Sequence, residues 1–189
     1  MSEHVKPGRR VGSYAALLFM LMAWLVIFPI FSTGGTKSSI VSEILFAALL
    51  LSSVGAAAGH PREMRALGLL AISLVAVSVI RHAGWGPQLS IRVTLESLRI
   101  LFLILIIRVV LKHIIRTRSV TIDMILGAVC VYLMMAGVFA EAYRILDMLD
   151  PHAIQFIDET VAADLPKGYT EDRYVYFSMV TLTTLGFGD

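Results

Sequence analysis

Charged residues and cysteines are scarce in this chain of 189 residues. Asp, Glu, Lys and Arg together make up 16% of it, whereas soluble domains contain about 25% charged residues. The single cysteine, Cys130, lies in an apolar run, which excludes an intrachain disulfide and a cysteine metal site and favours a small buried residue. The net charge of +2 gives no indication of a nucleic-acid partner.

Catalytic and cofactor-binding patterns are also missing from the sequence. It contains no recognisable set of nucleophile, base and orienting residue, and no glycine-rich loop that could cradle a phosphate. His113 and His152 have no companion ligands at metal spacing, so we assign no side-chain metal site. The sequence therefore predicts a protein that is not an enzyme and has no cofactor.

Apolar residues, in contrast, make up 57% of the chain and gather into long runs. A helix that crosses a membrane needs about 20 apolar residues, so this length can hold about five or six crossings and no separate catalytic domain. The third run is short and is the least secure span. We expect an all-α integral membrane protein with about five transmembrane helices, over residues 11–31, 40–58, 66–80, 93–111 and 122–143.

Basic residues near the ends of these runs set the expected orientation. Because such residues favour the cytoplasmic side, we expect a multi-pass protein of the cell membrane (inner or plasma membrane) with a cytoplasmic N-terminus. The acid-rich stretch 147–173 then lies outside, either as a negative vestibule that concentrates cations or as a solvated loop. The residues placed inside are Lys6, Arg9, Arg10, Arg62, Arg65, Lys112, Arg116 and Arg118.

The fourth run contains Arg92, Glu96, Arg99 and Arg108. Voltage-sensor helices carry a basic residue at every third position, whereas these arginines are seven and nine residues apart. Glu96 stands at helical spacing from Arg92 and Arg99, so we expect local ion pairing near the outer interface.

Two further charged features remain open to two interpretations each. Glu43, inside the second run, either pairs with Arg99 or lies near the outer surface. The basic stretch 108–118 either lies along the cytoplasmic interface as a linker to the pore or simply flanks a span on its positive side.

The last residues combine a short apolar segment with a glycine-containing loop. Residues 174–189 are too few to cross a membrane before the glycines, which favours a half-membrane helix followed by a loop. Rings of backbone carbonyls could there replace the hydration shell of a cation. Such a stack needs alternating backbone conformations, some with positive φ, and Gly186 and Gly188 adopt these at little cost.

Residues 184–189 read Thr-Leu-Gly-Phe-Gly-Asp and resemble the potassium-channel filter signature Thr-x-Gly-Tyr/Phe-Gly-Asp. The preceding run resembles the pore helix of the prokaryotic potassium-channel family, the one-pore-loop ion channels. The resemblance implies passive conduction of K⁺ by a homotetramer, with one filter strand from each chain and membrane lipid around it. It implies K⁺ coordination by Thr184, Leu185, Gly186 and Phe187, completed by Gly188, and support from Asp189, Thr183, Tyr176 and Phe177.

Two residues depart from the family pattern. Phe187 replaces the common filter tyrosine and lacks the hydroxyl that can brace the filter, so we expect a less rigid filter. Val180 stands where some members carry a carboxylate, so no carboxyl pair with Asp189 can form.

The resemblance divides the chain into an N-terminal four-helix membrane region, residues 1–118, and a pore region, residues 119–189. The pore region contains an outer helix, an extracellular loop, the pore helix and the filter. We expect the inner helix, and any cytoplasmic regulatory segment, beyond Asp189. Two alternatives stay open, a less selective cation channel and a non-conducting membrane scaffold or accessory subunit.

Overall fold

The described part of the chain is helical and contains no strand. The computed structural model describes residues 13–27, 46–49, 52, 61–84, 86–116, 121–150, 153–154 and 169–186. Its main helices are α1 (Ser13–Met22), which continues as a π-helical segment (Ala23–Ile27), α4 (Pro61–His82), α5 (Gln88–Arg116), α6 (Ile122–Leu149) and α8 (Tyr169–Leu182). The all-α prediction is confirmed for these residues.

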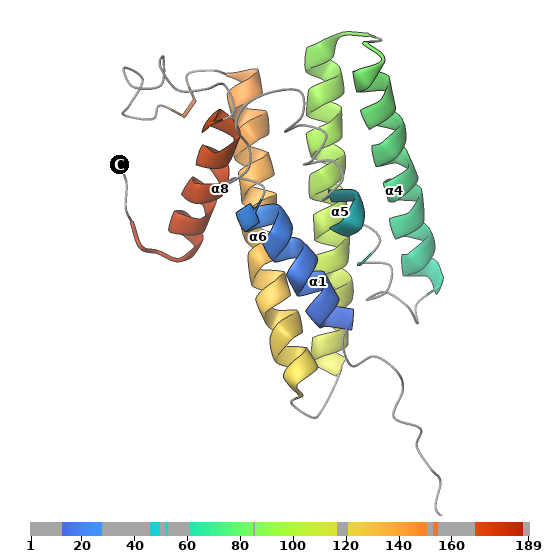
Figure 1. The fold of residues 1–189 in the computed structure, drawn as a ribbon, viewed down its shortest axis with the longest axis vertical. Helices are drawn as coiled ribbons and strands as arrows, with labels where there is room; N and C mark the ends of the chain where they lie inside the picture. The colour runs from blue at the N-terminus through green and yellow to red at the C-terminus, as the bar shows by residue number, and fades with distance from the viewer. Residues whose placement is uncertain are drawn as a thin grey trace, which may run out of the picture.

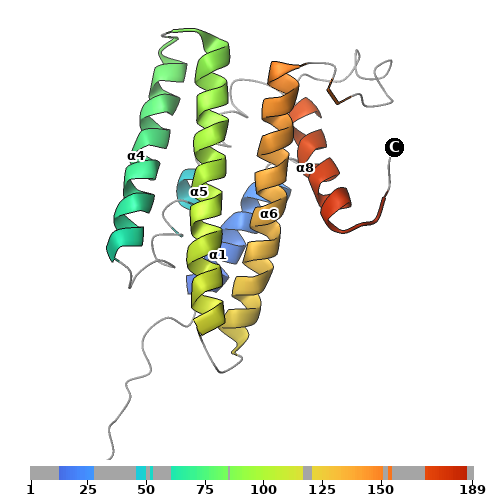
Figure 2. The ribbon, with the colours of Figure 1, turned by 180° about the vertical axis from the view of Figure 1, so that it is seen from behind.

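Three long helices form the frame of the molecule. α5 lies between α4 and α6 and runs antiparallel to both, while α1 packs against α6 (Figures 1 and 2). Few residues separate α4 from α5 and α5 from α6 along the chain, which favours antiparallel neighbours. As a result, the starts of α1, α4 and α6 and the end of α5 gather at one end of the bundle.

Side-chain contacts confirm that common end. The Lys112 ammonium near the end of α5 lies 2.7 Å from a carboxylate oxygen of Glu63, in the first turn of α4. The ring of Tyr14, at the start of α1, lies 5.9 Å from the ring of His113. The bundle therefore brings together the helix ends that, from the distribution of basic residues, we expect on the same aqueous side.

The core lies where α1, α5 and α6 meet. Leu17, Leu21, Phe102 and Met134 are completely buried there, as is the free thiol of Cys130, so the prediction of a buried cysteine is confirmed. Small residues on α6 allow the close approach. A Cβ added at Gly137 would lie only 3.2 Å from the ring of Trp24, which follows α1.

Two described helices are long and apolar enough to cross a membrane, Glu63–His82 in α4 and Ile122–Leu149 in α6. Only 11% and 28% of their most apolar windows are buried in the chain. The core helix of a soluble protein would instead be largely buried. Apolar side chains such as Leu69, Ile72 and Ile122 thus face outward from the chain.

The predicted runs agree with the helices in position more than in length. The third run, expected to be the least secure, forms the 22-residue α4. α5 extends the fourth run at both ends and includes the basic residues 108–116, and α6 starts at Ile122 as predicted. Of the second run, 40–58, the structure describes only residues 46–49 and 52. Glu43 lies outside the described residues.

The fifth predicted run, which ends at about Tyr143, is shorter than the helix that forms there. α6 continues through Leu149 before its backbone becomes extended at Asp150. A helix keeps its backbone hydrogen bonds when it leaves an apolar layer, so a change to polar residues does not end it. Most of the outer stretch, 155–168, lies outside the described residues.

Candidate ion-conduction site

The pore-helix segment predicted from the motif is α8. It starts near the C-terminal end of α6 and runs back alongside it, and it ends partway along that helix (Figures 1 and 2). Its 14 residues correspond to roughly 21 Å of helix, less than the roughly 30 Å of a hydrocarbon core. The chain after α8 then turns away from the helix direction. α8 alone is therefore too short to cross such a layer.

Polar and aromatic contacts fix α8 on α6. The hydroxyl of Ser178 donates a hydrogen bond of 2.6 Å to the backbone carbonyl of Ala136, and both residues are completely buried. The ring of Phe177 packs edge-on against the ring of Tyr143, with 5.0 Å between the centroids. A side-chain hydrogen bond also joins Tyr174 of α8 to Asp147 of α6. The position of α8 along α6 is therefore set at three points.

The C-terminal end of α8 has a defined cap. The backbone N–H of Thr184 donates to the carbonyl of Thr181, and the N–H of Leu185 donates to the carbonyl of Val180, both at 3.2 Å. These two bonds, together with the left-handed backbone of Thr184 (φ 55°), make a Schellman motif. Glycine usually occupies this position, because a β-branched residue is strained there.

Thr184 is accordingly a backbone outlier at the first residue of the filter signature. Among the described non-glycine residues it alone has a positive φ. Backbone strain of this kind costs roughly 1–3 kcal/mol and concentrates at functional sites. The sequence predicted a role for the Thr184 carbonyl and hydroxyl but gave no sign that its backbone would be left-handed.

The next two residues continue an alternation. Leu185 does not have a positive φ, whereas Gly186 has φ 62°. A Cβ added at Gly186 would meet no atom within 4 Å, so the backbone conformation, and not lack of space, requires glycine here. The sign of φ therefore alternates over Thr184, Leu185 and Gly186.

The remaining predicted site residues are only partly described. Phe187, Gly188 and Asp189 lie outside the described residues. The Thr183 hydroxyl donates to the carbonyl of Met179 within α8, at 2.7 Å. Of the two aromatic residues expected to support the filter, Phe177 packs on α6, while Tyr176 is 58% exposed.

A buried group of four charged residues joins α5 to α6. A guanidinium nitrogen of Arg99 lies 3.0 Å from a carboxylate oxygen of Glu96, and one of Arg144 lies 2.9 Å from Glu141. Arg144 also approaches Glu96 across the helix interface at 3.8 Å. With two positive and two negative charges, the group is formally neutral.

The Glu96–Arg99 pair predicted from the sequence is confirmed, and the structure adds that both residues are buried within the bundle. Glu96 and Arg99 are 5% and 6% exposed, and the Arg99 guanidinium also stacks 5.3 Å above the ring of Phe46. Glu141 and Arg144 were missed. Their spacing of three residues at the end of the fifth run, matching that of Glu96 and Arg99, was the available signal.

The α8 cap and the loop after it could act on an ion through backbone oxygens. In the described part of the chain, no three His, Cys, Asp or Glu side chains come together to hold a metal ion. Hydrogen bonds and ring contacts fix the α8 scaffold, as a site built from carbonyl dipoles requires. No protein-family model, curated protein or solved structure matches the chain.

Proposed function

We propose that the chain is a subunit of a potassium-selective channel that conducts K⁺ passively through a homotetrameric pore. The observation that carries this proposal is the conformation of residues 184–186. A half-length helix ends in a strained turn in which Thr184 and Gly186 have positive φ, inside a sequence that resembles the filter signature. Backbone strain at these positions is expected if the carbonyls must point along one axis.

The proposed chemistry is exchange of hydration water for protein oxygens. K⁺ gives up its water to the carbonyls of Thr184, Leu185, Gly186 and Phe187, with the Thr184 hydroxyl as the innermost ligand. Each chain supplies only one oxygen per level, so four chains are needed to complete each ring.

The surface around the turn supports assembly. Leu185 is 62% exposed in the single chain. Tyr176 of α8 and Phe139 of α6 are also exposed. Exposed apolar side chains can mark places where another molecule binds. A ring of four chains would cover α8 and the turn on the side that α6 leaves open.

The proposed setting is a cell membrane, crossed several times, with the N-terminus in the cytoplasm. The outward-facing apolar residues of α4 and α6 support contact with lipid. The end of the bundle that holds Arg65, Lys112 and Arg116 would face the cytoplasm, in keeping with the preference of basic residues for that side. α8 would then enter from the outer face.

A less selective cation channel is the second candidate. Phe187 favours it, because the residue lacks the hydroxyl with which a filter tyrosine can bond to the pore helix. A more deformable filter holds its carbonyls less firmly at the distances suited to K⁺.

Reversal potentials distinguish these functions. The full-length oligomer is placed in a planar bilayer with equal concentrations of K⁺ on one side and Na⁺ on the other. A large potential of the sign expected for K⁺ supports the proposal, and a potential near zero supports the less selective channel. An intact oligomer that passes no current under any condition would instead support a membrane scaffold.

A further inference from the structure

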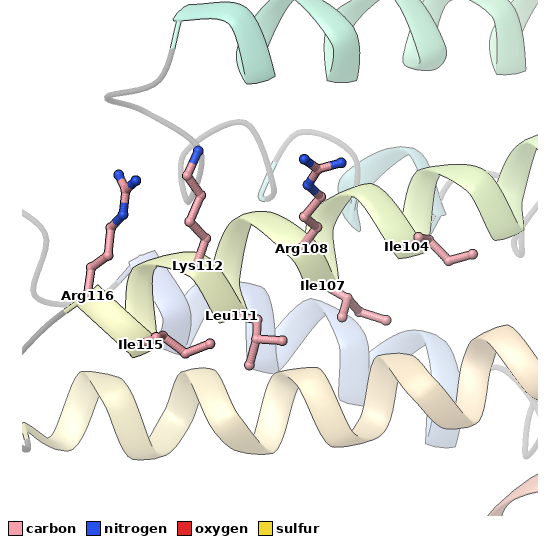
Figure 3. Close-up of a pocket in the computed structure, with 7 residues that line it drawn as sticks. All are labelled: Ile104, Ile107, Arg108, Leu111, Lys112, Ile115 and Arg116. Atoms are coloured by element: carbon pink, nitrogen blue, oxygen red, sulfur yellow. The ribbon is translucent and has the colours of Figure 1, made fainter.

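The C-terminal half of α5 carries an open groove of about 480 Å³. Two neighbouring rows of side chains line it, each with members four residues apart, so the groove lies between two ridges of the helix surface. Figure 3 shows the cationic side chains extending together from one side of α5, with aliphatic side chains on the adjacent side. The first row is Ile104, Arg108, Lys112 and Arg116, and the second is Ile107, Leu111 and Ile115.

The positive charges of the first row are only partly compensated. Lys112 pairs with Glu63 at 2.7 Å. Arg108 and Arg116 are exposed and make no ion pair or hydrogen bond with the described residues. They lie roughly 12 Å apart along the helix axis, on either side of Lys112. The groove therefore offers two guanidinium groups to an anion.

The apolar side of the groove is equally unpartnered. Ile115 is 74% exposed, and Ile104 and Leu111 are close to half exposed. A soluble anion would use the arginines and leave these side chains uncovered, whereas a neutral lipid would cover them and leave the arginines without counterions. An anionic lipid satisfies both sides, because it carries a phosphate and apolar chains in one molecule.

We propose that this groove binds one anionic phospholipid of the cytoplasmic leaflet. The site rests on the membrane orientation proposed above, which puts the end of α5 at the cytoplasmic interface. The phosphate lies near Lys112 and Arg116, and Arg108, one turn deeper, extends its flexible side chain to the same headgroup. One acyl chain lies along Ile107, Leu111 and Ile115. The anionic lipids of this leaflet attract basic residues next to the membrane.

Lipid retention by the full-length oligomer tests the site. The delipidated oligomer in neutral detergent is titrated with phosphatidylglycerol or phosphatidylcholine, and native mass spectrometry counts the bound lipids. Each basic residue near an anionic surface strengthens binding by a factor of about five, so R108Q/R116Q should weaken phosphatidylglycerol binding by roughly 25-fold. R108K/R116K keeps the charges and should retain most of the binding.

R92Q is the matched control, because Arg92 is an exposed arginine of the same helix near its opposite end. It should leave lipid retention unchanged. Equal retention of the two lipids by the wild type, or no effect of R108Q/R116Q, would overturn the proposal. So would displacement of phosphatidylglycerol by inorganic phosphate alone, which would indicate a soluble-anion site, or dissociation of lipid-free R108Q/R116Q, which would indicate an interface between chains.

Crosslinking of the wild type gives a test that does not depend on the folding of a variant. A photoreactive phosphatidylglycerol should label the peptide that contains residues 104–116, and labelling confined to other segments would contradict the site. Potassium flux measured on the same sample separates the two proposals. Flux without any preference for phosphatidylglycerol rejects the lipid site alone, and lipid preference without flux rejects the channel alone.

Discussion

Ser178 of α8 and Ala136 of α6 are joined by a hydrogen bond of 2.6 Å between the serine hydroxyl and the alanine carbonyl. Both residues are completely buried, so no water competes for this contact. Ala136 has a side chain small enough for the serine to reach the helix backbone behind it. The bond fixes the level at which α8 stands beside α6, and with it the level of the turn at Thr184.

Removal of this hydroxyl by Ser178→Ala should loosen α8. The expected loss of stability is about 0.5–1.5 kcal/mol, because the Ala136 carbonyl keeps its helical hydrogen bond and is not left unsatisfied. Thermal unfolding of the oligomer measures the change. Thr181→Val is the control, because the Thr181 hydroxyl bonds only to carbonyls of its own helix. Equal effects of both substitutions would show that the bond to α6 has no special role.

A second prediction concerns the buried group of four charged residues between α5 and α6. Glu141→Gln leaves two arginines against one carboxylate in the core, and breaking a buried ion pair in this way costs about 3–5 kcal/mol. Adding Arg144→Gln restores neutrality and should recover part of the loss, with a coupling energy of about 0.5–3 kcal/mol. A double-mutant cycle on the unfolding of the oligomer gives this number. Additive effects would contradict a direct Glu141–Arg144 interaction.

Arg99 should behave as a packing residue rather than a gating charge. Its guanidinium is buried, pairs with Glu96 of its own helix and stacks on the ring of Phe46, which are the contacts of a packing residue. Arg99→Gln should therefore lower the yield and thermal stability of the oligomer and leave the conductance–voltage curve unchanged. A steep wild-type curve that this substitution flattens would refute the prediction.

The sequence predicted helices well where apolar runs have clear ends, as at Ile122, because periodicity and hydropathy are local properties. It failed to predict the interior of the bundle. Burial of Glu141 and Arg144 depends on the charged pair that α5 presents opposite them, and no pattern within α6 contains that information. The left-handed backbone of Thr184 was missed for a similar reason. Threonine alone disfavours that conformation, and the hydrogen bonds to Thr181 and Val180 stabilise it.

The proposed topology predicts which face a chemical probe reaches. Cysteines replace Arg116, at the end of α5, and Asp150, directly after α6, which lie at opposite ends of the bundle and are both exposed. With Cys130 replaced by alanine, a membrane-impermeant maleimide should label position 116 only from the cytoplasm and position 150 only from outside. The reverse pattern would invert the orientation and remove the basis for the lipid site.

Gly186→Ala tests the ion-conduction site. At φ 62° an L-residue is strained by roughly 1–2 kcal/mol, and four chains repeat that strain in one ring. We expect the ring to distort and selective K⁺ flux from reconstituted vesicles to disappear. The oligomer should still assemble, because the added methyl group meets no atom of its own chain within 4 Å and the helix contacts are unchanged.

Gly68→Ala in α4 is the matched control. Its added methyl group also meets no atom within 4 Å, but its backbone is helical, so alanine should preserve flux and slightly stabilise the helix. Both variants add one methyl group that meets no atom of its own chain within 4 Å, and they differ in whether the backbone φ is positive. Loss of flux in Gly186→Ala alone therefore assigns the effect to the backbone conformation of the turn. Unchanged selective flux in both would show that Gly186 does not shape the conduction path, and the site proposed at residues 184–188 would then be wrong.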